Sequence, residues 1–182
     1  MAQLNGNQPA HRARRAVPVL IALALQVALA GQVDILGGRP NFMVALACAL
    51  APGMPAGPAA LLGFACGLAF DLTASVPVGL TALLLTVACF ALSCATSGHA
   101  LGLSSAGIRL TVAAVIAVEL VYGVAMALMG QAGLVSSVVG HGLITGVISA
   151  LVSLAFLPFG GEGDSGRGFS GRPSGTRYKV LR

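Results

Sequence analysis

The chain has 182 residues, of which 57% are hydrophobic and only 8% are charged, whereas an ordinary soluble domain is about 25% charged. This composition excludes a soluble globular protein and indicates an integral membrane protein, and the continuous apolar runs favour helices over the alternating strands of a barrel. The net charge of +5 comes from basic residues near the two ends; these lack interleaved aromatic residues, so no nucleic-acid partner is expected.

The polar and basic residues 1–15 are expected to be a disordered N-terminus. Three arginines in "HRARR" precede an apolar run from about Val17 to Val33, which is interpreted as a retained first helix. Asp34 and the "GGRP" turn end this helix, because paired glycines and a proline interrupt helical geometry. Asp34 and Arg39 are expected to contact water or each other.

A stretch of about thirty residues without a charge follows Arg39 and is divided by "PGMPAGP". Three prolines in seven residues cannot all lie inside one helix, so a helical hairpin is predicted. Each arm has about 14 to 16 residues and would span roughly 21 to 24 Å, less than a hydrocarbon core of about 30 Å. The two arms are therefore expected to be short, buried or re-entrant.

Further apolar runs extend from about Val78 to Thr96 and from about Leu110 to Met129, and "GQAG" leads into a sixth run that ends near Pro158. Residues 16–159 are thus predicted to form an all-α, polytopic membrane bundle of about six helices, followed by a disordered basic tail at 160–182. With the N-terminus inside, every Lys and Arg except Arg39 falls on the cytoplasmic side, which is the distribution that the positive-inside rule favours. The expected location is the cell (inner) membrane, with both termini cytoplasmic.

Few side chains in the sequence could carry chemistry. The four cysteines lie in apolar runs without a CxxC pair and are interpreted as small packing residues. The sequence has no phosphate loop, no nucleophile beside a base and no suitably spaced carboxylate pair. An enzyme is therefore not expected, and no catalytic, cofactor-binding or metal-binding residue is predicted.

Asp71 is the only charged residue between Arg39 and Arg109. It follows Ala59, Gly63 and Gly67 at intervals of four residues, so it shares a helix face with small residues that permit close helix packing. In an antiparallel hairpin folded near the central proline, Arg39 would lie level with Asp71, and an ion pair between them is predicted. The alternative is that Asp71 caps loop amides in "TASVP".

Glu119 lies near the middle of the fifth apolar run, where it is costly unless protonated or hydrogen-bonded. Folding the last two helices about "GQAG" is expected to bring it near His141 and Thr145. This arrangement fits either a proton relay or a structural hydrogen bond between helices. Gly142 and Gly146, like Gly123 on the preceding helix, are predicted to be packing positions.

A family resemblance emerges from these segments. The dipeptide "RP" at Arg39 and Pro40, the proline-broken hairpin and "GFACGLAFDLTASVPVGLTAL" together resemble the MreD family of the bacterial rod-shape system. The resemblance covers about Ala16 to Pro158 in length and helix order, and Asn41 departs from it because the family often has an acid there. The motif G-x-x-x-G-x-x-x-D-x-x-x-x-x-P-x-G falls on Gly63, Gly67, Asp71, Pro77 and Gly79.

The resemblance implies a non-enzymatic membrane scaffold of the cell-elongation machinery, which supports peptidoglycan synthesis and rod shape. Its expected partners are MreC, together with MreB, RodA and a class B penicillin-binding protein, within the lipid membrane. MreD is similar in fold to the S component of energy-coupling-factor transporters, so the alternative function is a vitamin-type binding subunit of a transporter. No cofactor is expected, and the candidate structural or partner-binding residues are Arg39, Pro40, Gly63, Gly67, Asp71, Pro77, Gly79 and Glu119.

Overall fold

The computed structural model describes residues 8–29, 32–34, 37–74, 78–96, 104–130 and 133–160. The fold is all-α, and the six helical segments agree with the number predicted from the sequence. The bounds are α1 Gln8–Leu29, α2 Phe42–Leu50 with the short 3-10 turn η1 Ala51–Gly53, α3 Ala56–Thr73, α4 Leu80–Thr96, α5 Ser105–Leu128, and one continuous helix made of α6 Leu134–Ser136, η2 Ser137–Ile144 and α7 Thr145–Gly160.

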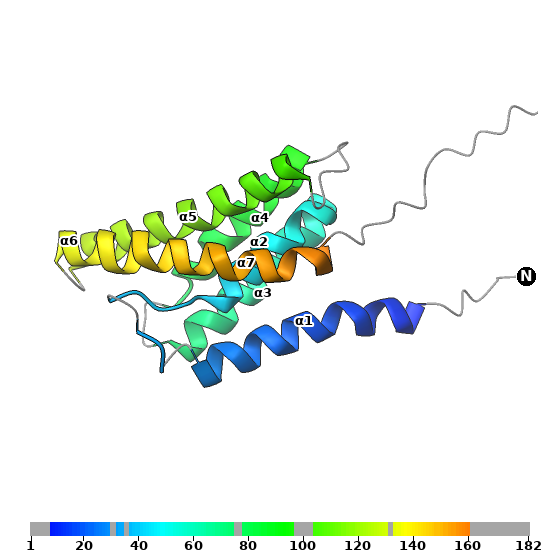
Figure 1. Ribbon diagram of the computed structural model, residues 1–182, viewed down its shortest axis with the longest axis horizontal. Helices are drawn as coiled ribbons and strands as arrows, with labels where there is room; N and C mark the ends of the chain where they lie inside the picture. The colour runs from blue at the N-terminus through cyan, green and yellow to red at the C-terminus, as the bar shows by residue number, and fades with distance from the viewer. Residues whose placement is uncertain are drawn as a thin grey trace, which may run out of the picture.

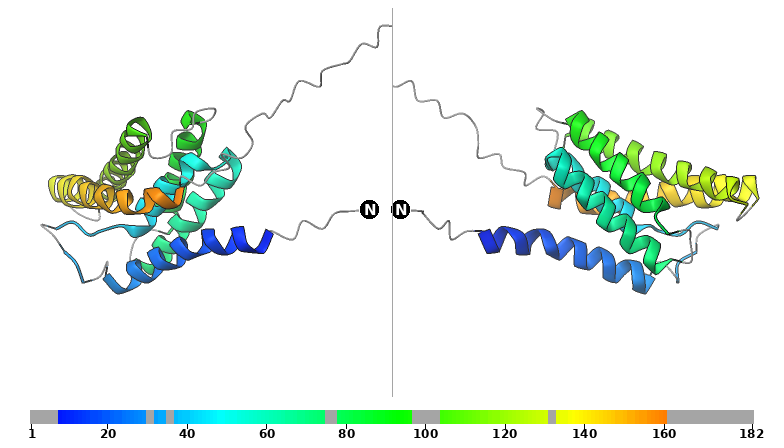
Figure 2. Two further views of the ribbon diagram at one scale, coloured as in Figure 1. Left: turned by 45° about the vertical axis from the view of Figure 1, so that its right-hand side comes forward. Right: turned by 180° about the vertical axis from the view of Figure 1, so that it is seen from behind.

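Within the described ranges, three helices are long and apolar enough to cross a membrane: α3, α5 and the segment Ser137–Gly160. The apolar part of α1, Val17–Leu29, and α4 are shorter. The start of α1 and the end of α7 lie at the same end of the bundle in all views (Figures 1 and 2). These features are those of a multi-pass membrane protein in which the first and last helices have their outer ends on one side.

Helix α1 begins at Gln8 rather than near Val17, so the helix extends into the stretch 1–15 that was expected to be disordered. Arginine and alanine are good helix formers, which explains why the helix continues past the apolar run. Residues 1–7 and the tail from 161 onwards lie outside the described residues. Within the bundle α1 packs mainly on α2, along the lower edge in Figure 1.

Helix α2 is the centre of the fold, and all nine of its residues are buried. It is only about 14 Å long, and it contacts α1, α3, α4, α5 and α7. The predicted hairpin therefore has unequal arms, because α3 has 18 residues. The first arm is short because the backbone is non-helical from Gly37 to Asn41, where two glycines and a proline disfavour a helix.

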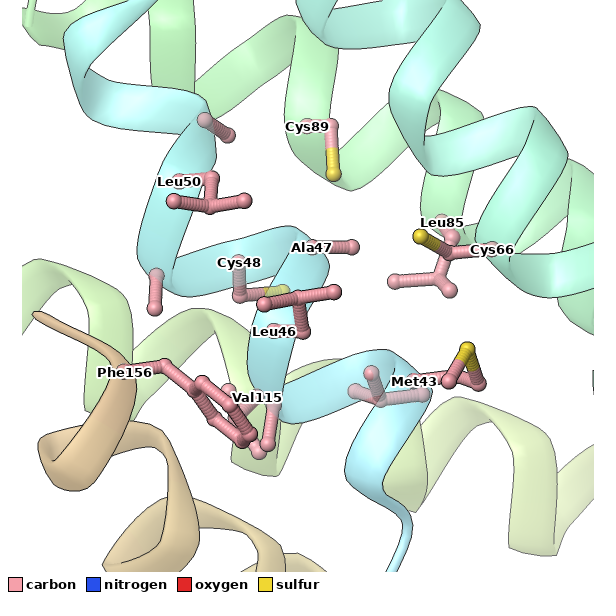
Figure 3. Packing of buried hydrophobic residues seen from close by; sticks show 14 of the residues in the cluster. Met43, Leu46, Ala47, Cys48, Leu50, Cys66, Leu85, Cys89, Val115 and Phe156 are labelled. Atoms are coloured by element: carbon pink, nitrogen blue, oxygen red, sulfur yellow. The ribbon is translucent and has the colours of Figure 1, made fainter. Parts of the chain in front are cut away.

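The core forms on both sides of α2 (Figure 3). Side chains of α2 lie between Cys66, Leu85 and Cys89 on one side and Val115 and Phe156 on the other. Three of the four cysteines are buried in this core as small packing residues, as predicted, whereas Cys94 is exposed on the outside of α4. The second helical segment is therefore buried rather than lipid-facing, which is one of the outcomes expected for the short arm of the hairpin.

Candidate functional site

Gly63, Gly67, Asp71 and Gly79 form the joint between α3 and α4. A Cβ atom added to Gly63 would collide with the backbone carbonyl of Leu85, and one added to Gly67 would lie 2.6 Å from the backbone nitrogen of Ala82. Both glycines are buried. The two helices therefore approach so closely that only glycine fits at these positions, which confirms that the small-residue stripe is a helix-packing face.

Asp71 ends the same stripe and caps the start of α4. Its Oδ2 atom accepts hydrogen bonds from the backbone nitrogens of Gly79, at 2.8 Å, and Ala82, at 3.2 Å. Gly79 adopts a φ of 101°, a left-handed conformation that favours glycine. The Asp71 side chain thus lies at the start of α4, the positive end of the helix dipole.

The predicted ion pair between Arg39 and Asp71 is wrong. The Asp71 side chain is 1% exposed and directed to α4, whereas the Arg39 side chain is 63% exposed and its Nε atom lies 3.6 Å from Oδ2 of Asp34. The prediction that Arg39 lies level with Asp71 assumed that the first arm of the hairpin is helical up to Arg39. Extended backbone rises about 3.3 Å per residue instead of 1.5 Å, so the non-helical segment moves Arg39 away from the level of Asp71. The alternative interpretation was closer, although the capped amides lie just beyond "TASVP".

A second polar arrangement surrounds the start of α2, and we term it the α2 cap cluster. Its members are side chains from three helices and the loop before α2: Gln26, Asn41, Glu119, Thr145 and Ser149. All five are buried. Together they place polar atoms in the middle of the bundle, where lipid and apolar side chains could offer no hydrogen bond.

Side chains of the α2 cap cluster accept hydrogen bonds from backbone amides that have no acceptor within a helix. The Arg39 nitrogen donates to Thr145 Oγ1 at 3.1 Å, and the Asn41 nitrogen donates to Ser149 Oγ at 2.9 Å. The Phe42 nitrogen donates to Gln26 Oε1 at 2.9 Å. Asn41 itself is the N-cap, since its Oδ1 atom accepts from the Val44 nitrogen at 3.2 Å. Side chains of α1 and α7 thus hold α2 in place.

Glu119 faces this cluster from α5 and is 2% exposed. Its carboxyl is hydrogen-bonded by the side-chain amide of Asn41, while its Oε1 atom is buried without a partner. A Cβ atom added to Gly146 would lie 3.4 Å from the Glu119 Cβ, so Glu119 packs against the first turn of α7. Its proximity to His141 and Thr145 stays a prediction. Thr145 instead bonds the Arg39 amide, and the His141 side chain lies outside the described residues.

The contact between α5 and the last helix depends on the predicted small residues. A Cβ atom added to Gly123 would lie 2.8 Å from the Ser137 carbonyl and 3.0 Å from the Gly142 Cα atom. Ser137 Oγ also donates to the Gly123 carbonyl at 2.9 Å. The last helix is π-helical over Ser137–Ile144, a geometry that often accompanies functional or strained positions.

Pro40 and Pro77 are the remaining predicted positions. Pro40 is buried in the segment before α2, and Pro77 lies outside the described residues. In the described ranges no three His, Cys, Asp or Glu side chains are grouped so that they could hold a metal ion. Comparisons with protein-family models, curated proteins and solved structures find no match.

Sequence reasoning missed three members of the α2 cap cluster as site residues: Gln26, Asn41 and Ser149. Asn41 was noted only as a departure from the family pattern, although asparagine directly before an apolar run is a recognised N-cap signal. Gln26 was a detectable polar residue within the first apolar run. Ser149 gave no signal of its own, because serine is common in membrane helices as a packing residue.

We predict that Gly67→Ala lowers the stability of the protein by about 1 to 3 kcal/mol, because the added methyl group overpacks a backbone contact. Ala65→Leu is the control on the same helix, since Ala65 is exposed. The measurement is the midpoint of heat unfolding in detergent, followed by circular dichroism. Equal midpoints for the two variants would contradict the close α3–α4 joint.

We also predict that Asp71→Ala destabilises the protein by about 0.5 to 2 kcal/mol, the usual cost of removing an N-cap acceptor. Arg39→Ala should change the stability little, because its partner is an exposed carboxylate and such pairs contribute about 0 to 1 kcal/mol. The double variant should behave like Asp71→Ala. A large loss in Arg39→Ala that disappears in the Asp71→Ala background would restore the ion-pair interpretation.

Proposed function

We propose that this protein is a non-enzymatic, MreD-like scaffold of the bacterial cell-elongation machinery in the inner membrane. In this proposal it binds MreC and supports peptidoglycan synthesis and rod shape, together with MreB, RodA and a class B penicillin-binding protein. Both termini are cytoplasmic, as the distribution of Lys and Arg favours. The fold proposed for the bundle is that of an S component of energy-coupling-factor transporters.

The motif behind the resemblance supports this proposal because its residues act together. Gly63, Gly67, Asp71 and Gly79 all take part in one joint between α3 and α4. A pattern that specifies a helix joint constrains the whole fold, and a chain that keeps the pattern is expected to keep the fold. The motif residues thus support the family resemblance through structure, while partner contacts are assigned to the outer surface of the bundle.

The observation that carries the proposal is that the start of α2 is closed by the protein itself. A broken helix whose N-terminus lies inside a membrane bundle is a common ligand-binding arrangement in transporters. Here the amides of Asn41, Phe42 and Val44 are engaged by side chains of the chain, and every residue of α2 is buried. A vitamin-binding subunit needs polar groups that remain available to a ligand, and these paired amides do not, so the scaffold is favoured.

The outer surface is suited to lipid and to neighbouring helices. Large apolar side chains are exposed on every long helix, including Leu61 and Phe64 on α3 and Leu83 and Phe90 on α4. Such faces are expected on a protein surrounded by lipid tails, and helix association in a membrane is driven by packing between them. We assign MreC binding to these faces rather than to the interior.

One feature favours the alternative function, a small-molecule-binding transport subunit. Glu119 places a buried carboxyl oxygen without a partner next to the start of α2. A ligand with a hydrogen-bond donor could occupy this position if the bundle opened. The two functions differ in phenotype, because a transport subunit is required for uptake and a scaffold for shape.

The test uses a strain that lacks this chain and is complemented with the wild-type protein. We expect MreC to co-purify with the tagged protein in mild detergent, and we expect cell shape to be restored by complementation while vitamin uptake is the same with and without the chain. A reporter fused to the C-terminal tail should be active only in its cytoplasmic form.

Two variants on the same helix serve as controls. Ala65→Leu changes the lipid-facing side of α3 and should complement fully, whereas Gly67→Leu disturbs the joint with α4 and should not. Normal shape combined with lost uptake in the deletion strain would overturn the scaffold assignment. Absence of MreC from the purified complex, with shape unaffected by the deletion, would do the same.

A further inference from the structure

The two carboxyl groups inside the bundle are held in different ways. Asp71 has an oxygen that accepts two backbone hydrogen bonds at the start of α4. Glu119 is hydrogen-bonded by the Asn41 side chain alone, and its second oxygen, Oε1, is enclosed without a donor. An ionised carboxylate at the centre of a membrane costs about 2.5 to 3.5 kcal/mol on insertion scales. Asp71 Oδ2 has two backbone donors that offset part of such a cost, although the Asp71 Oδ1 atom is also buried without a partner. Within the described residues no backbone amide donates to Glu119.

No cation neutralises Glu119 within the described part of the chain. Arg39 and Arg109, the arginines whose side chains are described, are both exposed. The titratable neighbours are Cys48 on α2 and Tyr122 one turn further along α5, and Tyr122 also interacts electrostatically with Asp71 of α3. From α7, Gly146 packs against the Glu119 side chain. These groups are neutral or acidic, so none of them supplies a positive charge.

We propose that Glu119 is a proton-binding site in the membrane interior, with Oε1 as the atom that carries the proton. Three observations support this assignment: the Glu119 side chain is buried, its Oε1 atom has no partner, and no described arginine side chain lies in the interior beside it. The neutral acid keeps its other oxygen as a carbonyl that accepts the hydrogen bond from the Asn41 side chain. Proton uptake from water converts the carboxylate to a carboxylic acid and changes no other bond.

This inference is independent of the scaffold assignment, because it concerns the chemical state of one side chain. It also links that state to the position of α2, since Asn41 both caps α2 and bonds Glu119. In the neutral state α5 and the α2 cap are joined by a hydrogen bond without a buried charge. Loss of the proton would leave a carboxylate with a single donor in an apolar bundle.

Infrared spectroscopy of the full-length protein tests the proposal, because the carbonyl stretch of a protonated carboxyl is separate from the bands of a carboxylate. The protein is purified in a maltoside detergent, which contains no ester carbonyl. At neutral pH we expect this band in the wild type and in Asp71→Asn, and we expect its loss in Glu119→Gln. The band should shift in heavy water, and above its midpoint the residual protonated fraction should fall about tenfold per pH unit.

Asn41→Ala provides a second readout that a merely structural role would not move. Loss of the hydrogen bond to the Glu119 carbonyl should shift the band to higher frequency while leaving it present. The proposal is overturned if the wild-type band is absent at neutral pH, or if it survives in Glu119→Gln. It is also overturned if sodium chloride, compared with choline chloride, removes the band, because a metal cation would then occupy the site.

Discussion

The buried start of α2 is the constraint on which the rest of the bundle depends. The first amides of any helix have no partner within the helix, and here they lie where neither water nor lipid can pair with them. Gln26 on α1 and Ser149 on α7 supply acceptors, and Asn41 supplies its own. Two helices far apart in the sequence are thereby fixed around a third that is too short to cross the membrane alone.

The same problem at the start of α4 has a different solution. There a single carboxylate, Asp71, accepts two amides, and the close approach that Gly63 and Gly67 allow brings α3 near enough for it to do so. Amide and hydroxyl side chains thus hold the start of α2, and a carboxyl side chain holds the start of α4.

The sequence was sufficient to predict the class of the fold and one of the two joints. Continuous apolar runs predicted six helical segments, and the four-residue spacing from Gly63 to Asp71 predicted the packing face of α3. Whether Arg39 pairs with Asp71 could not be decided from the number of residues between them, because converting that number into a height requires a helical rise throughout. The extended backbone before Asn41 places Arg39 at a different height. The amides of this segment bond to side chains of α7, and only the structure shows that α7 lies beside it.

The α2 cap cluster was also beyond sequence reasoning, for a physical reason. Its hydrogen bonds join residues more than a hundred positions apart, such as Asn41 and Ser149, and no local pattern encodes such a pairing. Glu119 was recognisable because a carboxyl in an apolar run is costly wherever it lies. Its neighbours were recognisable only in part, since the turn at "GQAG" fixes which helix it faces but not which side chains bond it.

Heat unfolding of two serine variants on α7 tests the central claim most directly. Ser149 and Ser153 are both fully buried, but Ser149 accepts the Asn41 amide whereas Ser153 bonds only the Ala150 carbonyl of its own helix. Ser149→Ala leaves a buried amide without a partner and should cost about 1 to 3 kcal/mol, while Ser153→Ala should cost clearly less. Equal losses, or a larger loss for Ser153→Ala, would contradict the account.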